Sequence, residues 1–414
     1  MPGFAALNPG GARRPYHART ETRRGRALPG AAFPKDPMMR IDTLPTPSAL
    51  IDVPRMQRNI ERMQQRLDAL GVRFRPHVKT TKCEPVVRAQ LAAGARGITV
   101  STLKEAEQFF AQGIDDIVYA VGMVPGKLPQ ALALIRRGCD LKLVADSLVS
   151  AKAIAAFGRE QGLSFEVWVE IDVDGHRSGL APADERLIEV GRALVEGGMK
   201  LGGVLAHAGS SYDYHRHEDL VRIAEQERAG AVLAAERLRA AGLPCPVVSI
   251  GSTPTALSAE RLEGVTEVRA GVYVMFDLVM HNVGVCGTDE IALSVLTTVI
   301  GHQEEKGWAI VDAGWMAMSR DRGTQRQTRD FGYGLVCAED GSVLDGYLLG
   351  SANQEHGILQ RVGEPDREIA TRLPIGTRLR ILPNHACATG AQHPEYQAIA
   401  ADGSVQTWPR FYGW

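Results

Sequence analysis

The stretch VRFRPHVKTTK, residues 72–82, combines a short strand-like run with two lysines and is followed by a helix-like stretch over residues 84–93. A strand that leads directly into a helix is the unit of parallel α/β folds, whose enzymes carry their chemistry at the carboxyl ends of the strands. Lys79 has that position, and Lys82 is an alternative. Partial desolvation lowers the pKa of such a lysine and lets it form a Schiff base, so we predict that Lys79 is a reactive amine.

Further apolar runs of strand length follow this stretch. They lie at residues 97–100, 116–120, 141–145, 165–171, 201–206, 247–250 and 265–270. Helix-like stretches separate them, for example residues 103–111, 147–161 and 218–241. Short, largely apolar strands are typical of a sheet that is covered by helices on one face and filled by barrel packing on the other. We therefore predict an α/β fold with a (β/α)8 barrel over residues 39–285, and a doubly wound sheet is the alternative.

The pattern changes after residue 285. The β-like runs are then separated by segments rich in Gly, Asp and Asn, which indicates turns rather than long helices. These runs lie at residues 291–300, 308–311, 347–349, 378–382 and 396–399. We predict a separate, mostly β domain over residues 286–414.

The segment PNHAC, residues 383–387, follows one of these β-like runs. His385 and Cys387 could supply one imidazole and one thiolate to a divalent ion. The same two residues are also compatible with a buried histidine and a small buried thiol, because two ligands make a weak metal pattern. A site shared with Lys79 requires the two domains to meet.

Residues 1–38 are dominated by Gly, Pro, Ala and Arg and keep neither a helical nor a strand period. We exclude them from the fold as a disordered extension or an over-long start, since Met38 and Met39 immediately precede the patterned sequence. Six arginines against two acidic residues leave a transit peptide as the alternative.

Charge and composition exclude several classes of protein. The 414 residues carry a formal net charge of -1 and form no basic stripe in the patterned region, which argues against a nucleic-acid partner. No apolar run reaches the length of a membrane span. The six cysteines are scattered, which favours a reducing cytoplasm over a disulfide framework. A cytoplasmic enzyme with a small-molecule substrate fits these features.

Four separated motifs resemble those of the D-serine dehydratase and D-threonine aldolase family. They are RPHVKT (75–80), VSIGSTPT (248–255), VRAGVY (268–273) and PNHAC (383–387). The resemblance runs from about residue 41 to the C-terminus and implies an alanine-racemase-type barrel that binds pyridoxal 5'-phosphate (PLP), followed by a β domain. Family members that act on D-threo-3-hydroxyaspartate are closest in overall character. Thr81 departs from the pattern, because the family often has a histidine there.

The resemblance also implies roles for individual residues. Lys79 would hold PLP through a Schiff base, while His385 and Cys387 would hold a divalent ion such as zinc, manganese, cobalt or nickel. The other residues expected to bind the cofactor are Arg177, Tyr212, Gly251, Ser252, Thr253, Gly271, Val272 and Tyr273. Glycine-containing turns can present backbone N–H groups and hydroxyls to a phosphate. Arg269 is left out of the site, because a structural ion pair explains it equally well.

The function implied is a lyase, a dehydratase that converts a D-3-hydroxy amino acid, D-threo-3-hydroxyaspartate, to oxaloacetate and ammonia. D-serine is another candidate substrate. The family's aldolases tend to carry a carboxylate two residues after the metal histidine, where this chain has Cys387, so retro-aldol cleavage is the second alternative. A non-catalytic PLP carrier is the third, although such carriers resemble the barrel alone. Family barrels are commonly dimers, so the resemblance allows a homodimer.

Overall fold

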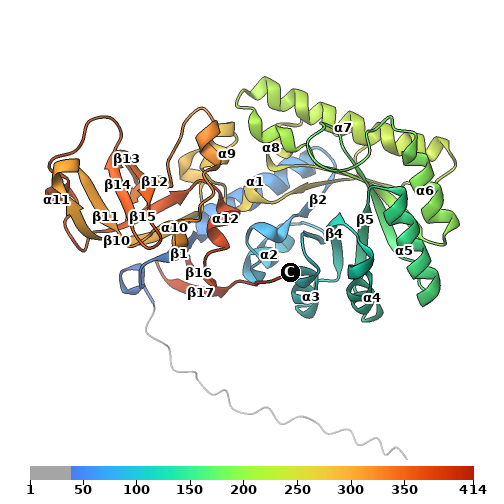
Figure 1. Ribbon diagram of the computed structural model, residues 1–414, viewed down its shortest axis with the longest axis horizontal. Helices are drawn as coiled ribbons and strands as arrows, with labels where there is room; N and C mark the ends of the chain where they lie inside the picture. Colours follow the sequence, from blue (N-terminus) through green and yellow to red (C-terminus); the bar gives the residue numbers. More distant parts are fainter. Residues whose placement is uncertain (1–38) are drawn as a thin grey trace, which may run out of the picture. The chain divides into compact units, whose positions relative to one another are not determined.

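Eight parallel strands form a nearly closed barrel in the first part of the chain (Figure 1). The computed structural model describes residues 39–414, and the predictions for residues 1–38 lie outside that range. The barrel strands are β2 (Arg73–Pro76), β3 (Ile98–Val100), β4 (Asp116–Gly122), β5 (Asp140–Ala145), β6 (Glu166–Ile171), β7 (Lys200–Ala206), β8 (Val247–Ile250) and β9 (Glu267–Ala270). Their order is β2-β9-β8-β7-β6-β5-β4-β3, and a bridge between His77 and Thr99 brings the outer strands together. The predicted barrel is confirmed.

Helices alternate with these strands and surround the barrel (Figure 1). They are α1 (Val53–Ala69), α2 (Glu84–Ala92), α3 (Leu103–Ala111), α4 (Leu128–Arg136), α5 (Leu148–Gln161), α6 (Arg186–Glu196), α7 (His217–Ala240) and α8 (Thr253–Ser258). In α1, Met56, Ile60, Met63 and Leu67 are buried at helical spacing, which gives the helix one apolar face. Asp52 caps this helix by accepting a 2.9 Å hydrogen bond from the Arg55 backbone N–H.

The second sheet contains strands from the last third of the chain. They are β10 (Leu293–Gln303), β11 (Trp308–Val311), β12 (Gly334–Ala338), β13 (Val343–Ala352), β14 (Gly357–Arg361), β15 (Arg378–Pro383), β16 (Glu395–Ile399) and β17 (Val405–Pro409). The short helices α9 (Leu278–Val283), α10 (Trp315–Met318), α11 (Ile369–Arg372) and α12 (Ala386–Gly390) accompany them. Because the long strand β10 pairs with both β11 and β15, six strands close into a small antiparallel barrel around Val299, Leu349, Leu359 and Ile381. The predicted β region is confirmed.

One strand of the second sheet comes from the start of the described chain. β1 (Ser48–Asp52) lies between β10, with which it is antiparallel, and β16, with which it is parallel. It falls within the range 39–285 that we predict for the barrel, because a strand of five residues carries no signal for partners so distant in sequence. The division into domains at residue 285 stays a prediction. β1 lies in the first predicted domain but pairs with strands of the second sheet.

Within residues 39–414, no helix combines the length and apolar character that crossing a membrane requires.

Candidate active site

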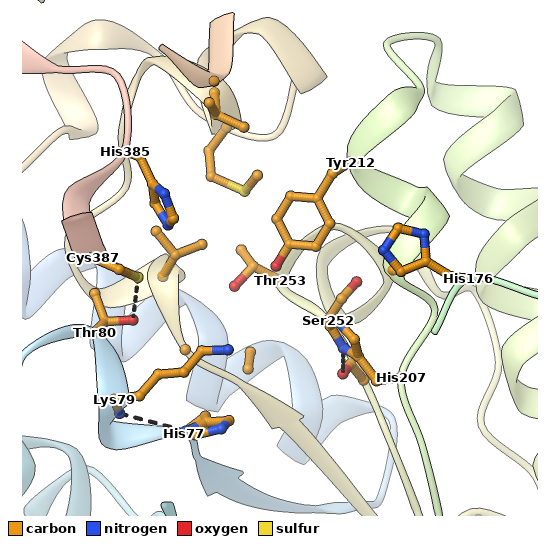
Figure 2. A pocket seen from close by; sticks show the side chains of 18 of the residues that line it. His77, Lys79, Thr80, His176, His207, Tyr212, Ser252, Thr253, His385 and Cys387 are labelled. Carbon is orange, nitrogen blue, oxygen red and sulfur yellow. Dashed lines mark hydrogen bonds between the residues drawn. The ribbon is translucent and has the colours of Figure 1, made fainter. Parts of the chain in front are cut away.

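A cavity of about 1200 Å³ lies between the carboxyl ends of the barrel strands and the loop that follows β15. Lys79 enters it from the barrel, while His385 and Cys387 face it from the second sheet (Figure 2). Tyr212 and Thr253 lie on the opposite wall (Figure 2). The two sequence segments that carry the predicted amine and the predicted metal ligands therefore share one cavity.

Lys79 belongs to a single 3-10 turn, η2 (Val78–Thr80), which begins directly after β2. The backbone N–H of Lys79 donates a 3.4 Å hydrogen bond to Nδ1 of His77. Burial, together with the positive charges of Lys79 and Arg269, holds the pKa of His77 well below its usual value. His77 is therefore neutral, and because its Nδ1 accepts this bond, the ring proton is on Nε2.

His207 is a site residue that the sequence analysis missed. It follows β7, lines the cavity, and its Nδ1 lies 2.9 Å from the carbonyl oxygen of Gly251. Burial lowers the pKa of His207 to about 4, despite that hydrogen bond and with a further contribution from the Lys79 charge. The neutral ring donates from Nδ1 to Gly251, which leaves Nε2 as an acceptor. Its position at the end of a parallel strand was the signal that could have identified it.

His385 and Cys387 lie beside each other at the other side of the cavity. Burial alone would lower the pKa of His385, but the adjacent Cys387 thiolate and the Asp321 carboxylate raise it to about 11. Burial would likewise raise the pKa of Cys387, but the His385 charge outweighs burial and lowers it. The Cys387 Sγ also lies 3.3 Å from the hydroxyl of Thr80, the residue after Lys79. The two pKa shifts have opposite directions because each side chain stabilises the charged form of the other.

Two carboxylates hold this segment in place, and the sequence pattern identified neither. Asp321 Oδ2 lies 2.6 Å from His385 Nδ1. Asp277 is buried, and its two carboxylate oxygens accept 2.9 Å hydrogen bonds from the backbone N–H groups of Met280 and Ala386. Asp277 thus links the start of α9 to the start of α12. Both carboxylates are far from residue 385 in sequence, so only the fold reveals them.

The predicted phosphate-binding turns both line the cavity, but their N–H groups are not equally available. The Gly251 N–H donates to the buried carboxylate of Glu227, on α7, at 3.1 Å. The hydroxyl of Ser252 lies 2.9 Å from that of Ser211. By contrast, the N–H groups of Gly271 and Val272 meet no acceptor within residues 39–414. The second turn is therefore the better anion cradle of the two.

Tyr273 differs from its predicted place. Its side chain is fully buried outside the cavity lining, where its hydroxyl accepts a 2.8 Å hydrogen bond from Gln90 and its ring packs edge-on against Phe74. Its backbone N–H donates to the Thr253 hydroxyl at 3.2 Å. The turn at Gly271 directs this ring into the core, so Tyr273 supports the cavity wall without facing the cavity.

Arg177 and Tyr212 line the cavity as predicted. The Arg177 guanidinium lies 3.6 Å from a carboxylate oxygen of Glu170 and remains largely exposed. Burial raises the pKa of Tyr212, and the negative charges of Cys387 and Asp277 add to that effect, so its phenol stays protonated. The Tyr212 and His207 rings lie 6.3 Å apart, centroid to centroid.

Arg269, which the sequence analysis left out, also lines the cavity. Its guanidinium donates 2.7 Å hydrogen bonds to the hydroxyl of Ser249 and to the carbonyl oxygen of Ala206. Burial lowers the pKa of Arg269 to about 10. No carboxylate lies within 4.0 Å of it among residues 39–414, so the structural ion pair, one of the two interpretations of this residue, is absent there. Arg269 is a buried cation at the cavity wall.

No cluster of three or more His, Cys, Asp or Glu side chains suited to a metal ion occurs in the part of the chain that the structure describes. A cation in this cavity would therefore have two protein ligands, His385 and Cys387, and would leave further coordination positions to water or substrate.

Gly251 provides a test of the wall's packing. Its φ is +132°, and a Cβ there would lie 2.1 Å from the carbonyl oxygen of Arg269. We expect Gly251→Ala to lower the thermal unfolding midpoint clearly more than Gly242→Ala does, since Gly242 also has positive φ but no atom within 4 Å of its Cβ position. Differential scanning calorimetry at one scan rate measures both; equal midpoints would contradict the close approach.

The fold and cavity define the chain as a barrel protein with a lysine-containing site at the carboxyl ends of its strands, completed by a β domain. Residues 51–278 match the family described as alanine racemase, N-terminal domain. Residues 292–399 match the family described as putative serine dehydratase domain.

Individual relatives agree with these matches. The chain is 71% identical to D-threo-3-hydroxyaspartate dehydratase of Delftia sp. strain HT23, over 90% of this chain and 98% of that protein. It is 30% identical to D-threonine aldolase of Arthrobacter sp., over 93% and 96% of the two chains. The solved structure of the Delftia enzyme superposes with a TM-score of 0.90 at 70% identity, covering 91% of this chain and all of that one. The chain therefore belongs to the alanine-racemase-type family that includes D-serine dehydratases and D-threonine aldolases.

Proposed function

We propose that the chain is a PLP- and divalent-metal-dependent dehydratase of D-3-hydroxy amino acids, with D-threo-3-hydroxyaspartate as its substrate. The observation that carries this proposal is the single cavity in which Lys79 faces the His385 and Cys387 pair. Similarity to a dehydratase of that substrate over nearly the whole chain supports it.

The residues present fit PLP. Lys79 offers an amine inside the cavity, and the N–H groups of Gly271 and Val272 offer an uncommitted phosphate cradle. Arg177 and Arg269 supply positive charge on the cavity walls. We propose that Lys79 holds the cofactor covalently, that Gly271, Val272 and Thr253 bind its phosphate, and that Tyr212 and His207 flank it.

The residues also fit a divalent metal ion, although they supply only two ligands. The hydrogen bond between His385 Nδ1 and Asp321 leaves Nε2 for the metal, as a carboxylate behind a metal-bound histidine does in many metal sites. Solved structures described as D-threo-3-hydroxyaspartate dehydratase include a histidine-to-alanine and a cysteine-to-alanine variant, the latter in a metal-free form. The two altered positions lie two residues apart, as His385 and Cys387 do.

When bound, PLP supplies an electron sink for the substrate Cα, and the metal ion supplies a Lewis acid for the β-hydroxyl. The chain's own groups do the rest. Lys79 Nζ accepts the Cα proton, and His385 and Cys387 position the leaving hydroxyl. Asp321 fixes the His385 ring, and Asp277 fixes the backbone that carries Cys387. The water lost in the elimination is regained when the product hydrolyses, so the net products are oxaloacetate and ammonia.

Incubating the purified protein with PLP, a divalent ion and D-threo-3-hydroxyaspartate tests the proposal. We expect oxaloacetate, measured with malate dehydrogenase, in equal amount to ammonia, because the elimination breaks the bond from Cβ to oxygen. An aldolase would instead break the bond from Cα to Cβ and release glycine. Glycine as the main product would overturn the dehydratase proposal, and the absence of any product would favour a PLP carrier.

A further inference from the structure

A substrate with a second carboxylate is bound best where a cationic donor is free to face it, and this inference rests on the proposed function. Four lysine and arginine side chains line the cavity: Lys79, Arg177, Arg269 and Arg326. The first is the proposed cofactor lysine, the second lies beside Glu170, and the third is committed to Ser249 and Ala206. The fourth, Arg326, has no role in the proposed cofactor or metal site.

Arg326 ends the 3-10 turn η8 (Gly323–Arg326), in the segment between α10 and β12. This segment contains four arginines. Arg322 pairs with Asp330 at 2.8 Å, while the guanidinium groups of Arg320 and Arg329 lie over the rings of Trp315 and Phe331. Within residues 39–414, the guanidinium of Arg326 has no carboxylate within 4.0 Å and makes no hydrogen bond, although it lines the cavity. It is therefore available to a ligand.

The backbone around Arg326 is fixed to both sides of the cavity. The Thr324 hydroxyl donates a 2.8 Å hydrogen bond to Asn384, the residue before His385. On the other side, Asn282 donates a 3.1 Å hydrogen bond to the side chain of Gln327. A guanidinium that extends from such an anchored turn has a defined reach, which favours recognition over non-specific charge.

The chemistry of the substrate places its second carboxylate near this turn. In 3-hydroxyaspartate the hydroxyl and the second carboxylate are both attached to Cβ. A hydroxyl positioned at His385 and Cys387 therefore puts the carboxylate within a few bonds of the same wall. The segment that carries Arg326 contacts this wall twice, through Asp321 to His385 and through Thr324 to Asn384.

We propose that Arg326 binds the second carboxylate of the substrate and selects 3-hydroxyaspartate over D-serine. A guanidinium can bind a carboxylate through two parallel, charge-assisted hydrogen bonds, which an ammonium cannot reproduce. D-Serine has no second carboxylate to accept these hydrogen bonds, so its binding gains nothing from Arg326.

The test compares substrates within each variant. In Arg326→Ala we expect the ratio of kcat/KM for D-threo-3-hydroxyaspartate to that for D-serine to fall by about 100-fold, the effect of losing a charge-assisted, bidentate contact. Arg326→Lys should give an intermediate ratio. Arg329→Ala, in the same segment but outside the cavity lining, should keep the wild-type ratio. An unchanged ratio in Arg326→Ala would overturn the inference.

A binding measurement separates this inference from the proposed function. D-Aspartate and D-alanine lack the β-hydroxyl, and only D-aspartate carries the second carboxylate. We expect Arg326→Ala to weaken binding of D-aspartate to the PLP-loaded protein, measured by the visible absorbance change, and to leave D-alanine binding nearly unchanged. Equal weakening of both would overturn the inference. Wild-type protein that discriminates the two ligands but releases no oxaloacetate would instead overturn the proposed function.

Discussion

Replacing Lys79 with alanine is expected to reduce turnover by roughly 1,000-fold or more, because one side chain would be lost both as cofactor anchor and as proton acceptor. The variant should also lose the visible absorbance that PLP acquires when bonded to a lysine. Ammonia release and an absorbance spectrum of the PLP-loaded protein measure both effects.

Lys82 provides the matched control, since it is the competing lysine in the sequence. Its ammonium lies 3.0 Å from the buried carboxylate of Glu105, and it does not line the cavity. We expect Lys82→Arg, which keeps a positive charge beside Glu105, to retain the absorbance and most of the turnover. If Lys82→Arg lost the visible absorbance and Lys79→Ala kept it, Lys82 rather than Lys79 would be the lysine that holds the cofactor.

Replacing Cys387 with alanine is expected to lower turnover by about 100-fold or more while the visible PLP absorbance remains. The reason is that the thiolate is one of only two protein ligands proposed for the metal, whose Lewis acidity contributes several kcal/mol at the leaving hydroxyl. Steady-state ammonia release and metal content by mass spectrometry are the measurements.

A chelator supplies the second half of this experiment. Removing the metal from the wild-type protein should lower its turnover to that of Cys387→Ala. The same chelator treatment should leave the turnover of Cys387→Ala unchanged. Cys139→Ala, a buried thiol outside the cavity lining, serves as the control and should keep both metal and turnover. Full activity in Cys387→Ala would refute a metal role for this residue.

The barrel could be predicted from sequence because most of its strands are short, largely apolar runs followed by a helix, and both patterns are local. For the same reason Lys79 could be placed, since its position follows from the end of one strand. The orientation of Tyr273 could not be predicted, because a single turn at Gly271 decides whether the ring faces the cavity or the core.

Residues that reach the cavity from distant segments carried no local signal. Asp277 and Asp321 act through contacts with residues 385 and 386, and nothing near either residue in sequence indicates those partners. Arg326 looks like one of several solvated arginines in its segment. Arg269 alternates with apolar neighbours, as a residue in a barrel strand does. This pattern indicates a strand, but it does not indicate that the side chain lines a cavity. Only the fold, which places these residues at or beside the cavity, distinguishes them from surface charges.

The position of β1 in the second sheet has a consequence for synthesis of the chain. A ribosome makes residues 48–52 before the barrel, yet their parallel partner β16 is made after nearly everything else. During translation, strands β2 to β9 can assemble as they emerge, while β1 still has an open edge that could pair with another nascent chain. β16 closes that edge, so β1 gains its second partner only after every barrel strand has been made.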